Sequence, residues 1–175
     1  MSVWRWLAAH IGTDEVYGSV EVGSSKETDG LEPRSPYSAS KAGSDLIALS
    51  YHATHGLPVT VTRCTNNFGP YQYPEKAIPL FTTNLLDGKQ IPLYGDGLNE
   101  RDWLYVDDHV EALKLVVRKS KSNQTYVVGG NNEIQNIDVV KEICSYLDKI
   151  IKIKPNQISS FHELIKFVED RPGHD

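Results

Sequence analysis

The segment Ser35–Arg63, SPYSASKAGSDLIALSYHATHGLPVTVTR, contains a helix signal followed at once by a strand signal. Ser35 can cap a helix, and Pro36 suits the first helical position. Apolar residues then recur at intervals of four and three along one helix face: Ala42, Leu46, Leu49 and Ala53. Gly56 is typical of a helix end. Val59–Arg63 alternates and is rich in β-branched residues, which predicts a strand directly after the helix.

Helix and strand signals alternate along the rest of the chain. We expect strands at Ala8–Ile11, Ile91–Tyr94, Trp103–Val106, Thr125–Val128 and Phe167–Val168. Helices are expected over Pro79–Leu86, after a cap at Asp107 or Asp108 with Val110, Leu113 and Val117 inward, and after Asn136 with Val140, Ile143 and Leu147 inward. Residues 19–34 and Asn66–Pro70 have the composition of a loop and a turn. The alternation predicts an α/β sheet with parallel crossovers, in which ligands gather where strands end.

Composition bounds the class of protein. The chain has 175 residues, and 18 Lys and Arg against 23 Asp and Glu give a net charge of −5, which argues against a nucleic-acid binder. Two cysteines do not make a disulfide scaffold, so we expect a reducing, cytoplasmic location. No apolar run reaches the ~18 residues that a membrane span needs, and residues 1–10 do not read as a signal peptide.

Tyr37 and Lys41 open the helix of the first segment. A spacing of four puts both side chains on one helix face. A lysine ammonium beside a phenol favours the phenolate and lowers the tyrosine pKa, so that Tyr37 can remove a proton from a sugar hydroxyl. Alone, Tyr-x-x-x-Lys is a weak signal, because many surface helices carry it.

A second group, Thr13-Asp14-Glu15, follows the first expected strand. Adjacent carboxyl groups can supply one proton donor and one proton acceptor if their environments separate their pKa values. The alternative is a turn with a helix cap and a solvated glutamate. We expect no metal site, because His52 and His55 lack an accompanying cysteine or carboxylate ligand pattern.

Six separated blocks appear in a fixed order along almost the whole chain. They are Thr13–Gly18 (TDEVYG), Ser35–Lys41 (SPYSASK), Asn66–Tyr71 (NNFGPY), Pro74–Lys76 (PEK), Arg101–Val106 (RDWLYV) and Asp170–His174 (DRPGH). In these blocks the chain resembles the extended short-chain dehydrogenase/reductase superfamily and, within it, the dTDP-glucose 4,6-dehydratases. The resemblance implies a partial Rossmann-like parallel sheet and a small C-terminal substrate-binding α/β region. The paired acids favour a dehydratase over the related nucleotide-sugar epimerases and decarboxylases, which remain the alternative reading.

The resemblance also implies a chemistry. NAD would accept a hydride from C4 of the hexose while Tyr37 takes the 4-hydroxyl proton, and Lys41 would assist Tyr37 and bind the nicotinamide ribose. Thr13 would hydrogen-bond the 4-oxygen. Glu15 matches the base for the C5 proton, and Asp14 matches the acid for the departing 6-hydroxyl group. Returned hydride at C6 would give the 4-keto-6-deoxy sugar.

Further residues match the family's cofactor and substrate contacts. Asn67 would contact the cofactor. Those expected around the nucleotide sugar, with dTDP-glucose favoured over a UDP sugar, are Asn66, Lys76, Ala77, Pro92, Leu93, Tyr94, Arg101, Asn136, Asp170, Arg171, Pro172, Gly173 and His174. Arg101 would bind the pyrophosphate, because a guanidinium can engage phosphate oxygens bidentately. Three plainer readings stay open: an Arg101–Asp102 ion pair, turn formation by Asn66–Asn67, and a helix cap at Asn136.

The chain departs from the family pattern at its start. It lacks the Gly-x-x-Gly-x-x-Gly turn that holds the NAD pyrophosphate at a helix N-terminus. We therefore expect a truncated dehydratase, with residues 1–70 the C-terminal part of an NAD-binding region, including the catalytic residues, and residues 71–175 a partly interleaved substrate region. Such a chain would bind NAD poorly and have little or no activity. A homodimer, pairing with a full-length homologue, or a non-catalytic nucleotide-sugar-binding fragment are the further expectations.

Overall fold

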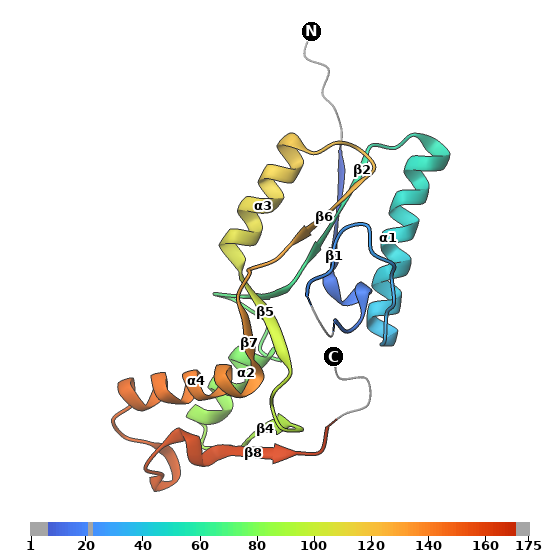
Figure 1. Cartoon of the computed structure of the whole chain (residues 1–175). Coiled ribbons are helices and arrows are strands. Elements are labelled where there is room, and N and C mark those ends of the chain that lie inside the picture. Colours follow the sequence, from blue (N-terminus) through green and yellow to red (C-terminus); the bar gives the residue numbers. More distant parts are fainter. Residues whose placement is uncertain (1–6, 21–22, 171–175) are drawn as a thin grey trace. The chain divides into compact units, whose positions relative to one another are not determined.

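The chain divides into two units that interleave along the sequence. The computed structural model describes residues 7–20 and 23–170 (Figure 1). Of the described residues, 7–20, 23–67 and 103–131 belong to the first unit, and 68–102 and 132–170 belong to the second. Residues 103–131, which the sequence places in the second region, thus cluster with the first unit.

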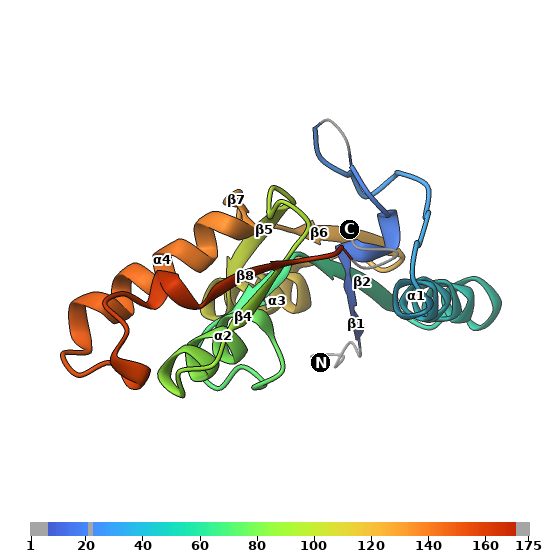
Figure 2. The ribbon, with the colours of Figure 1, turned by 90° about the horizontal axis from the view of Figure 1, so that it is seen from below.

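A parallel sheet forms the centre of the first unit. Its strands β1 (Ala8–Thr13), β2 (Val59–Cys64) and β6 (Gln124–Val128) lie in the order β1-β2-β6, and both pairings are parallel. Every residue of the central strand β2 is buried, as in parallel sheets that helices cover on both faces. Figures 1 and 2 show helix α1 (Pro36–His55) and helix α3 (Val106–Lys119) on opposite sides of this sheet. The expected α/β sheet with parallel crossovers is confirmed.

Helix α1 begins and ends where the sequence predicts. Ser35 and Ser38 form a reciprocal capping box, and Gly56 ends the helix with φ of 67°, a left-handed conformation that glycine adopts readily. The predicted inward face is wrong in part, because Leu46 is 57% exposed and the buried residues are Ser38, Ala42 and Asp45. An apolar pattern cannot anticipate a buried aspartate, whose place depends on a cation elsewhere in the chain.

The prediction for helix α3 is wrong in two respects. Its N-cap is Tyr105, and no side chain caps the helix, so that Asp107 and Asp108 lie in the first turn instead. There their charges complement the helix dipole. The buried residues are His109 and Val116, whereas Val110 and Val117 are exposed. The predicted and the observed buried residues both recur at helical spacing, so the sequence pattern alone cannot decide which set packs against the sheet.

The second unit contains short strands and two helices. Strand β4 (Ile91–Tyr94) pairs in parallel with β8 (Ile165–Val168), and β5 (Glu100–Tyr105) pairs through its first half with β7 (Glu133–Gln135) in antiparallel fashion. Where the chain passes from the first unit into the second, Asn66–Phe68 forms the short strand β3 rather than the expected turn. The remaining elements are α2 (Ala77–Leu86), α4 (Asn136–Ile150) and the short 3-10 helices η2 (Pro155–Gln157) and η3 (Phe161–Leu164).

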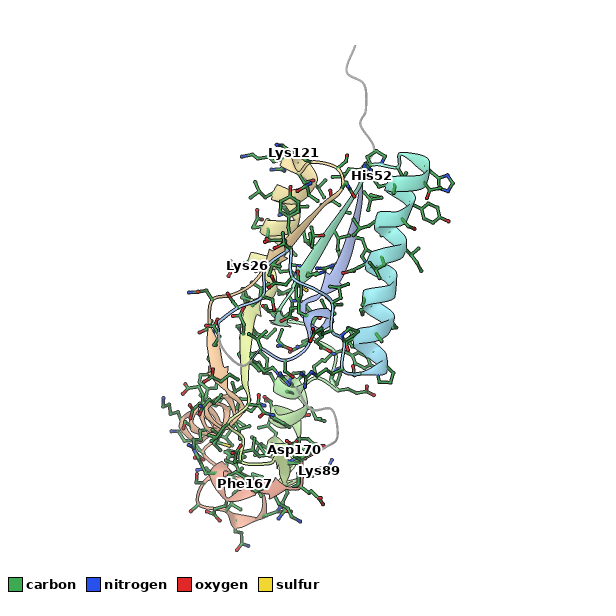
Figure 3. All side chains as sticks on the ribbon, turned by 45° about the vertical axis from the view of Figure 1, so that its right-hand side comes forward. Lys26, His52, Lys89, Lys121, Phe167 and Asp170 are labelled. Carbon is green, nitrogen blue, oxygen red and sulfur yellow. The ribbon has the colours of Figure 1, made fainter. Side chains whose placement is uncertain are left out.

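An apolar core joins these elements of the second unit. Its buried members are Leu85, Ile91, Leu93, Val140, Cys144, Leu147, Phe161 and Leu164. Phe161 of η3 has no exposed surface, whereas Phe167 of β8, which Figure 3 labels, is 57% exposed. In the part of the chain that the model describes, no helix combines the length and apolar character needed to cross a bilayer.

Phe161 and Phe167 allow a matched test of this core. We expect Phe161→Ala to lower the free energy of unfolding of the second unit by about 3–5 kcal/mol, because it removes a fully buried ring. Phe167→Ala should cost less than about 1 kcal/mol, because much of its ring already contacts water. Native-state hydrogen exchange of the α4 amides measures both. Equal losses of protection in the two variants would contradict this description of the core.

Candidate active site

The parallel register of β1 and β2 brings the predicted catalytic turn to the carboxyl end of the sheet. Thr13, the last residue of β1, pairs with Cys64, the last residue of β2. The 3-10 helix η1 (Asp14–Tyr17) begins directly after Thr13. His52 and Lys121 lie at the opposite, amino end of the strands (Figure 3). Strand ends of this kind are where ligand sites form in parallel α/β sheets.

Thr13 is the cap of the turn that carries both acids. Its hydroxyl donates to Asp14 Oδ1 over 3.3 Å and accepts from the backbone N–H of Glu15 over 3.4 Å. This turn with a cap and an exposed glutamate also matches the plainer reading of the motif. The environments of the two carboxyl groups differ, since Asp14 is half-buried and Glu15 is exposed.

Burial allows the Asp14 carboxyl group to act as a proton donor near neutral pH. Loss of hydration raises the pKa of the Asp14 carboxyl to about 6, with a smaller contribution from the charge of Glu15, and the hydrogen bond from Thr13 opposes the rise. A carboxyl group with this pKa is partly protonated near neutrality. It can therefore donate a proton where an ordinary aspartate cannot.

Tyr37 lies in the first turn of α1, beside the same acids. Its side chain is 52% exposed, yet partial burial raises its pKa, and the charges of Glu15, Cys64 and Asp14 raise it further. The Lys41 ammonium lies 5.9 Å from the centre of the Tyr37 ring. The expected lowering of the Tyr37 pKa by Lys41 is therefore wrong for this structure, because burial and the nearby negative charges raise that pKa.

Apolar contacts hold the turn η1 against helix α1. Val16 and Tyr17 of η1 pack with Ala42 of α1 in one buried cluster, with Leu31 and Val127 at its edge. Val16 follows Glu15, and Ala42 follows Lys41, so this cluster adjoins one predicted catalytic residue of η1 and one of α1. The structure thus brings Thr13, Asp14, Glu15, Tyr37 and Lys41 together within the first unit.

The predicted cofactor contacts fit a polar ligand. Among the described residues, the half-buried Lys41 ammonium forms no hydrogen bond or ion pair, which suits a donor reserved for a ligand hydroxyl. The side-chain amide of Asn67 donates to Cys64 Sγ over 3.2 Å and to the Thr65 carbonyl over 3.1 Å. Asn66 lies beside Asn67 in β3 and is half-buried.

Most predicted substrate contacts belong to the second unit. Lys76 is the N-cap of α2 and Ala77 its first residue, and both are exposed. Asp102 Oδ1 accepts the backbone N–H of Asn132 over 2.8 Å, and Arg101 pairs with Ile134 between β5 and β7. Asn136 begins α4, but the N-cap is Gln135, so the reading of Asn136 as a side-chain cap is wrong.

One group of these residues meets at β4 and β8. Tyr94 pairs with Val168, and Asp170 lies against Gly95, where an added Cβ would be 3.4 Å from its Oδ2 atom. Pro92 and Tyr94 are half-buried on one side of β4, whereas Leu93 is buried in the core and cannot offer its side chain to a ligand. The predicted contacts at Arg171, Pro172, Gly173 and His174 lie outside the described residues.

The sequence reasoning missed a buried polar chain behind the catalytic turn. Arg63 Nε donates to Asp45 Oδ2 over 2.8 Å, and its NH1 group donates to the Tyr17 hydroxyl over 2.7 Å. His10 Nε2 lies 3.0 Å from Asp45 Oδ1. An arginine inside a β-branched strand was the available signal, because a buried guanidinium needs a partner.

The sequence also indicates that the turns Thr13–Glu15 and Cys64–Asn67, each after an expected strand, share one site, and the structure pairs Cys64 with Thr13. The buried Cys64 thiol donates to the Gly12 carbonyl over 3.4 Å, and burial, followed by the charge of Asp14, raises its pKa. Within the described ranges, no three His, Cys, Asp or Glu side chains are grouped so that they could hold a metal ion.

The raised Asp14 pKa predicts a pH-dependent cost to stability. The pKa of Asp14 in the folded chain, about 6, lies above the ordinary 3.8. Asp14 therefore does not lower the free energy of unfolding below about pH 4, and it lowers that free energy as the pH rises toward and through 6. Asp14→Asn should raise the free energy of unfolding at pH 7 by on the order of 1–3 kcal/mol and should change it little at pH 4. Urea unfolding at both pH values measures this difference.

The control for this experiment is Glu32→Gln, which removes an exposed carboxyl group of the same unit. It should leave the free energy of unfolding nearly unchanged at both pH values. If Asp14→Asn destabilised the chain at pH 7, the burial argument for an Asp14 acid would be wrong.

The chain was compared with known proteins and solved structures. A family model described as GDP-mannose 4,6 dehydratase matches residues 5–175. A "Probable dTDP-glucose 4,6-dehydratase" of Sinorhizobium fredii is 53% identical over 167 residues, which are 95% of this chain and 47% of that relative. The chain therefore spans about half the length of such relatives.

Solved structures agree with this result. DesIV, a dTDP-glucose 4,6-dehydratase from Streptomyces venezuelae solved with NAD and TYD bound, matches with a TM-score of 0.86 and 48% identity over 97% of this chain and 49% of that chain. A UDP-glucuronic acid 4-epimerase from Bacillus cereus, solved with UDP-glucuronic acid and NAD, matches with a TM-score of 0.79 but 26% identity, over 96% of this chain and 50% of that chain. The chain belongs to the family described as GDP-mannose 4,6 dehydratase.

Proposed function

We propose that this chain supplies the catalytic residues of an NAD-dependent dTDP-glucose 4,6-dehydratase. One observation supports the proposal above the others: a half-buried acid with a pKa of about 6 and an exposed carboxyl group adjoin on one turn that contacts the Tyr37–Lys41 helix. Elimination of water across C5 and C6 of a hexose needs one group that removes a proton and another that donates one.

Each residue has a separate role in the proposed reaction. Tyr37 takes the proton of the 4-hydroxyl group, and Thr13, whose hydroxyl already bonds within the turn, orients the 4-oxygen. Glu15 removes the C5 proton, and Asp14 protonates the departing 6-hydroxyl group. Lys41 and Asn67 would hold NAD, which supplies a hydride acceptor and donor when bound.

Paired acids also separate this reaction from the epimerase alternative. An epimerase changes the configuration at C4 and loses no water, so it needs no second acid beside Glu15. The 48–53% identity to dehydratases, against 26% to an epimerase, points the same way. Because the chain spans about half of its relatives, we propose that turnover requires the other half as a separate polypeptide or as part of a longer chain.

The proposed division of roles predicts opposite effects of pH on the two steps. Tyr37 must lose its proton to act as a base, and its pKa is raised, so oxidation at C4 should accelerate as the pH rises. Asp14 must carry its proton to act as an acid, so elimination should slow as the pH rises above about 6. Presteady-state absorbance of NADH and of the keto sugar separates the steps.

Two variants test the roles directly. With dTDP-glucose, NAD and the N-terminal half supplied separately, Tyr37→Phe should lower the rate of oxidation by roughly 10²–10⁴-fold. Glu15→Gln should preserve oxidation and slow exchange of the C5 proton with deuterated water by a similar factor. Tyr146→Phe, which changes an exposed tyrosine of α4, is the control and should retain activity. A defect at the same step in Tyr37→Phe and Glu15→Gln would refute the division of labour.

Pairing of two copies through α1 is the proposed mode of assembly. Leu46, Ile47 and Tyr51 of this helix are 57%, 61% and 51% exposed, and exposed apolar side chains of this number on one helix mark an interaction surface. Sedimentation velocity should detect a dimer that Ile47→Glu dissociates. A monomeric wild-type chain at tens of micromolar would contradict this mode of pairing.

A further inference from the structure

Arg63 is buried in the central strand, where an ion is costly. Its side chain is 4% exposed, and that of its partner Asp45 has no exposed surface. Removing two charges from water commonly costs more than their attraction returns, so a pair of this kind is weak evidence for a purely stabilising role. The contacts of Arg63 and Asp45 indicate instead which elements the pair holds in place.

The contacts of Arg63 reach both parts of the candidate active site. One guanidinium nitrogen donates to the Tyr17 hydroxyl over 2.7 Å, and the guanidinium carbon lies 4.8 Å from the centre of the Tyr17 ring. Tyr17 is the last residue of η1, which carries Asp14 and Glu15. Nε donates to Asp45 over 2.8 Å, one helical turn after Lys41 on α1.

The remaining contacts of Asp45 fix it on its other side. His10 Nε2 of β1 lies 3.0 Å from Asp45 Oδ1 and within 3.4 Å of the Ser44 hydroxyl. A Cβ on Gly12 would lie 2.8 Å from the same Oδ1 atom, so the carboxylate occupies the space that a glycine leaves. One buried chain of polar contacts thus joins β1, α1, β2 and η1.

We infer that Arg63 is a positioning residue, which bridges Tyr17 and Asp45 and thereby fixes the acids of η1 relative to the Tyr37–Lys41 face of α1. This inference rests on the proposed function, in which both groups act on one hexose. A planar guanidinium suits the task, because its nitrogen donors point in fixed directions toward the two partners. An error of 1 Å between reacting groups can cost about 100-fold in rate.

The titrations of Asp14 and Tyr37 report the geometry without any turnover. Asp14 responds to its burial, to Thr13 and to Glu15, while Tyr37 responds to its burial and to Glu15, Cys64 and Asp14. If η1 loses its anchor, solvent reaches Asp14 and the acids move away from Tyr37. Both pKa values should then fall toward their ordinary values.

The experiment uses ¹³C NMR titrations of the 175-residue chain. Tyr17→Phe removes only the hydroxyl that Arg63 contacts, and Arg63→Lys keeps the charge but lacks the planar guanidinium whose donors point in fixed directions. We expect each variant to lower the midpoints of the Asp14 carboxyl and Tyr37 ring carbons by at least about half a pH unit. Tyr146→Phe, which removes an exposed hydroxyl group from α4, is the matched control and should leave both midpoints unchanged.

The contrary result is equally well defined. If Tyr17→Phe and Arg63→Lys reduce the urea midpoint of unfolding while both titrations stay at their wild-type values, Arg63 has a structural role only and the inference is overturned. Arg63→Lys with a smaller shift than Arg63→Gln would support it, because partial retention of the charge should partly rescue the position. Absence of dTDP-glucose turnover when the N-terminal half is supplied would refute the proposed function but would leave this measurement valid.

Discussion

Strands β1 and β2 run side by side in the same direction, with Thr13 opposite Cys64 at their carboxyl ends. Parallel pairing requires a long crossover, and α1 provides it on the way from η1 to β2. The first turn of that helix therefore returns to the edge of the sheet from which η1 departs. The closeness of Asp14, Glu15, Tyr37 and Lys41 follows from this one pairing, so a shift in its register would separate the acids from the tyrosine.

Two sets of contacts connect η1 to the rest of the first unit, one apolar and one polar. Val16, Tyr17 and Ala42 make an apolar contact between η1 and α1, which is favourable but has little directional preference. The buried contacts of Arg63 with Asp45 and Tyr17 have fixed directions and lengths. Apolar packing can hold the turn on the helix, and the directed contacts can select one orientation. This combination suits a site in which two carboxyl groups must face the same small ring.

The sequence predicts the positions of helices and strands well where they depend on neighbouring residues in the chain. The Ser35 cap, the Gly56 end and the β-branched strand at Val59 all have a local physical cause, and all were found. The predictions of which face of α1 and α3 is buried were wrong in part, because a periodic pattern does not specify which side of the helix packs against the sheet. The buried Asp45–Arg63 pair and the raised Tyr37 pKa depend on residues far apart in the chain, which no local pattern records.

In the proposed reaction, one hexose lies between the acids of η1 and the phenol of Tyr37. The most direct test is a crystal structure with dTDP-glucose bound, with the N-terminal half supplied. We expect the sugar 4-hydroxyl within about 3 Å of the Tyr37 hydroxyl, and Glu15 and Asp14 within similar reach of C5 and the 6-hydroxyl. A hexose bound away from η1, with neither acid near C5 or C6, would contradict it.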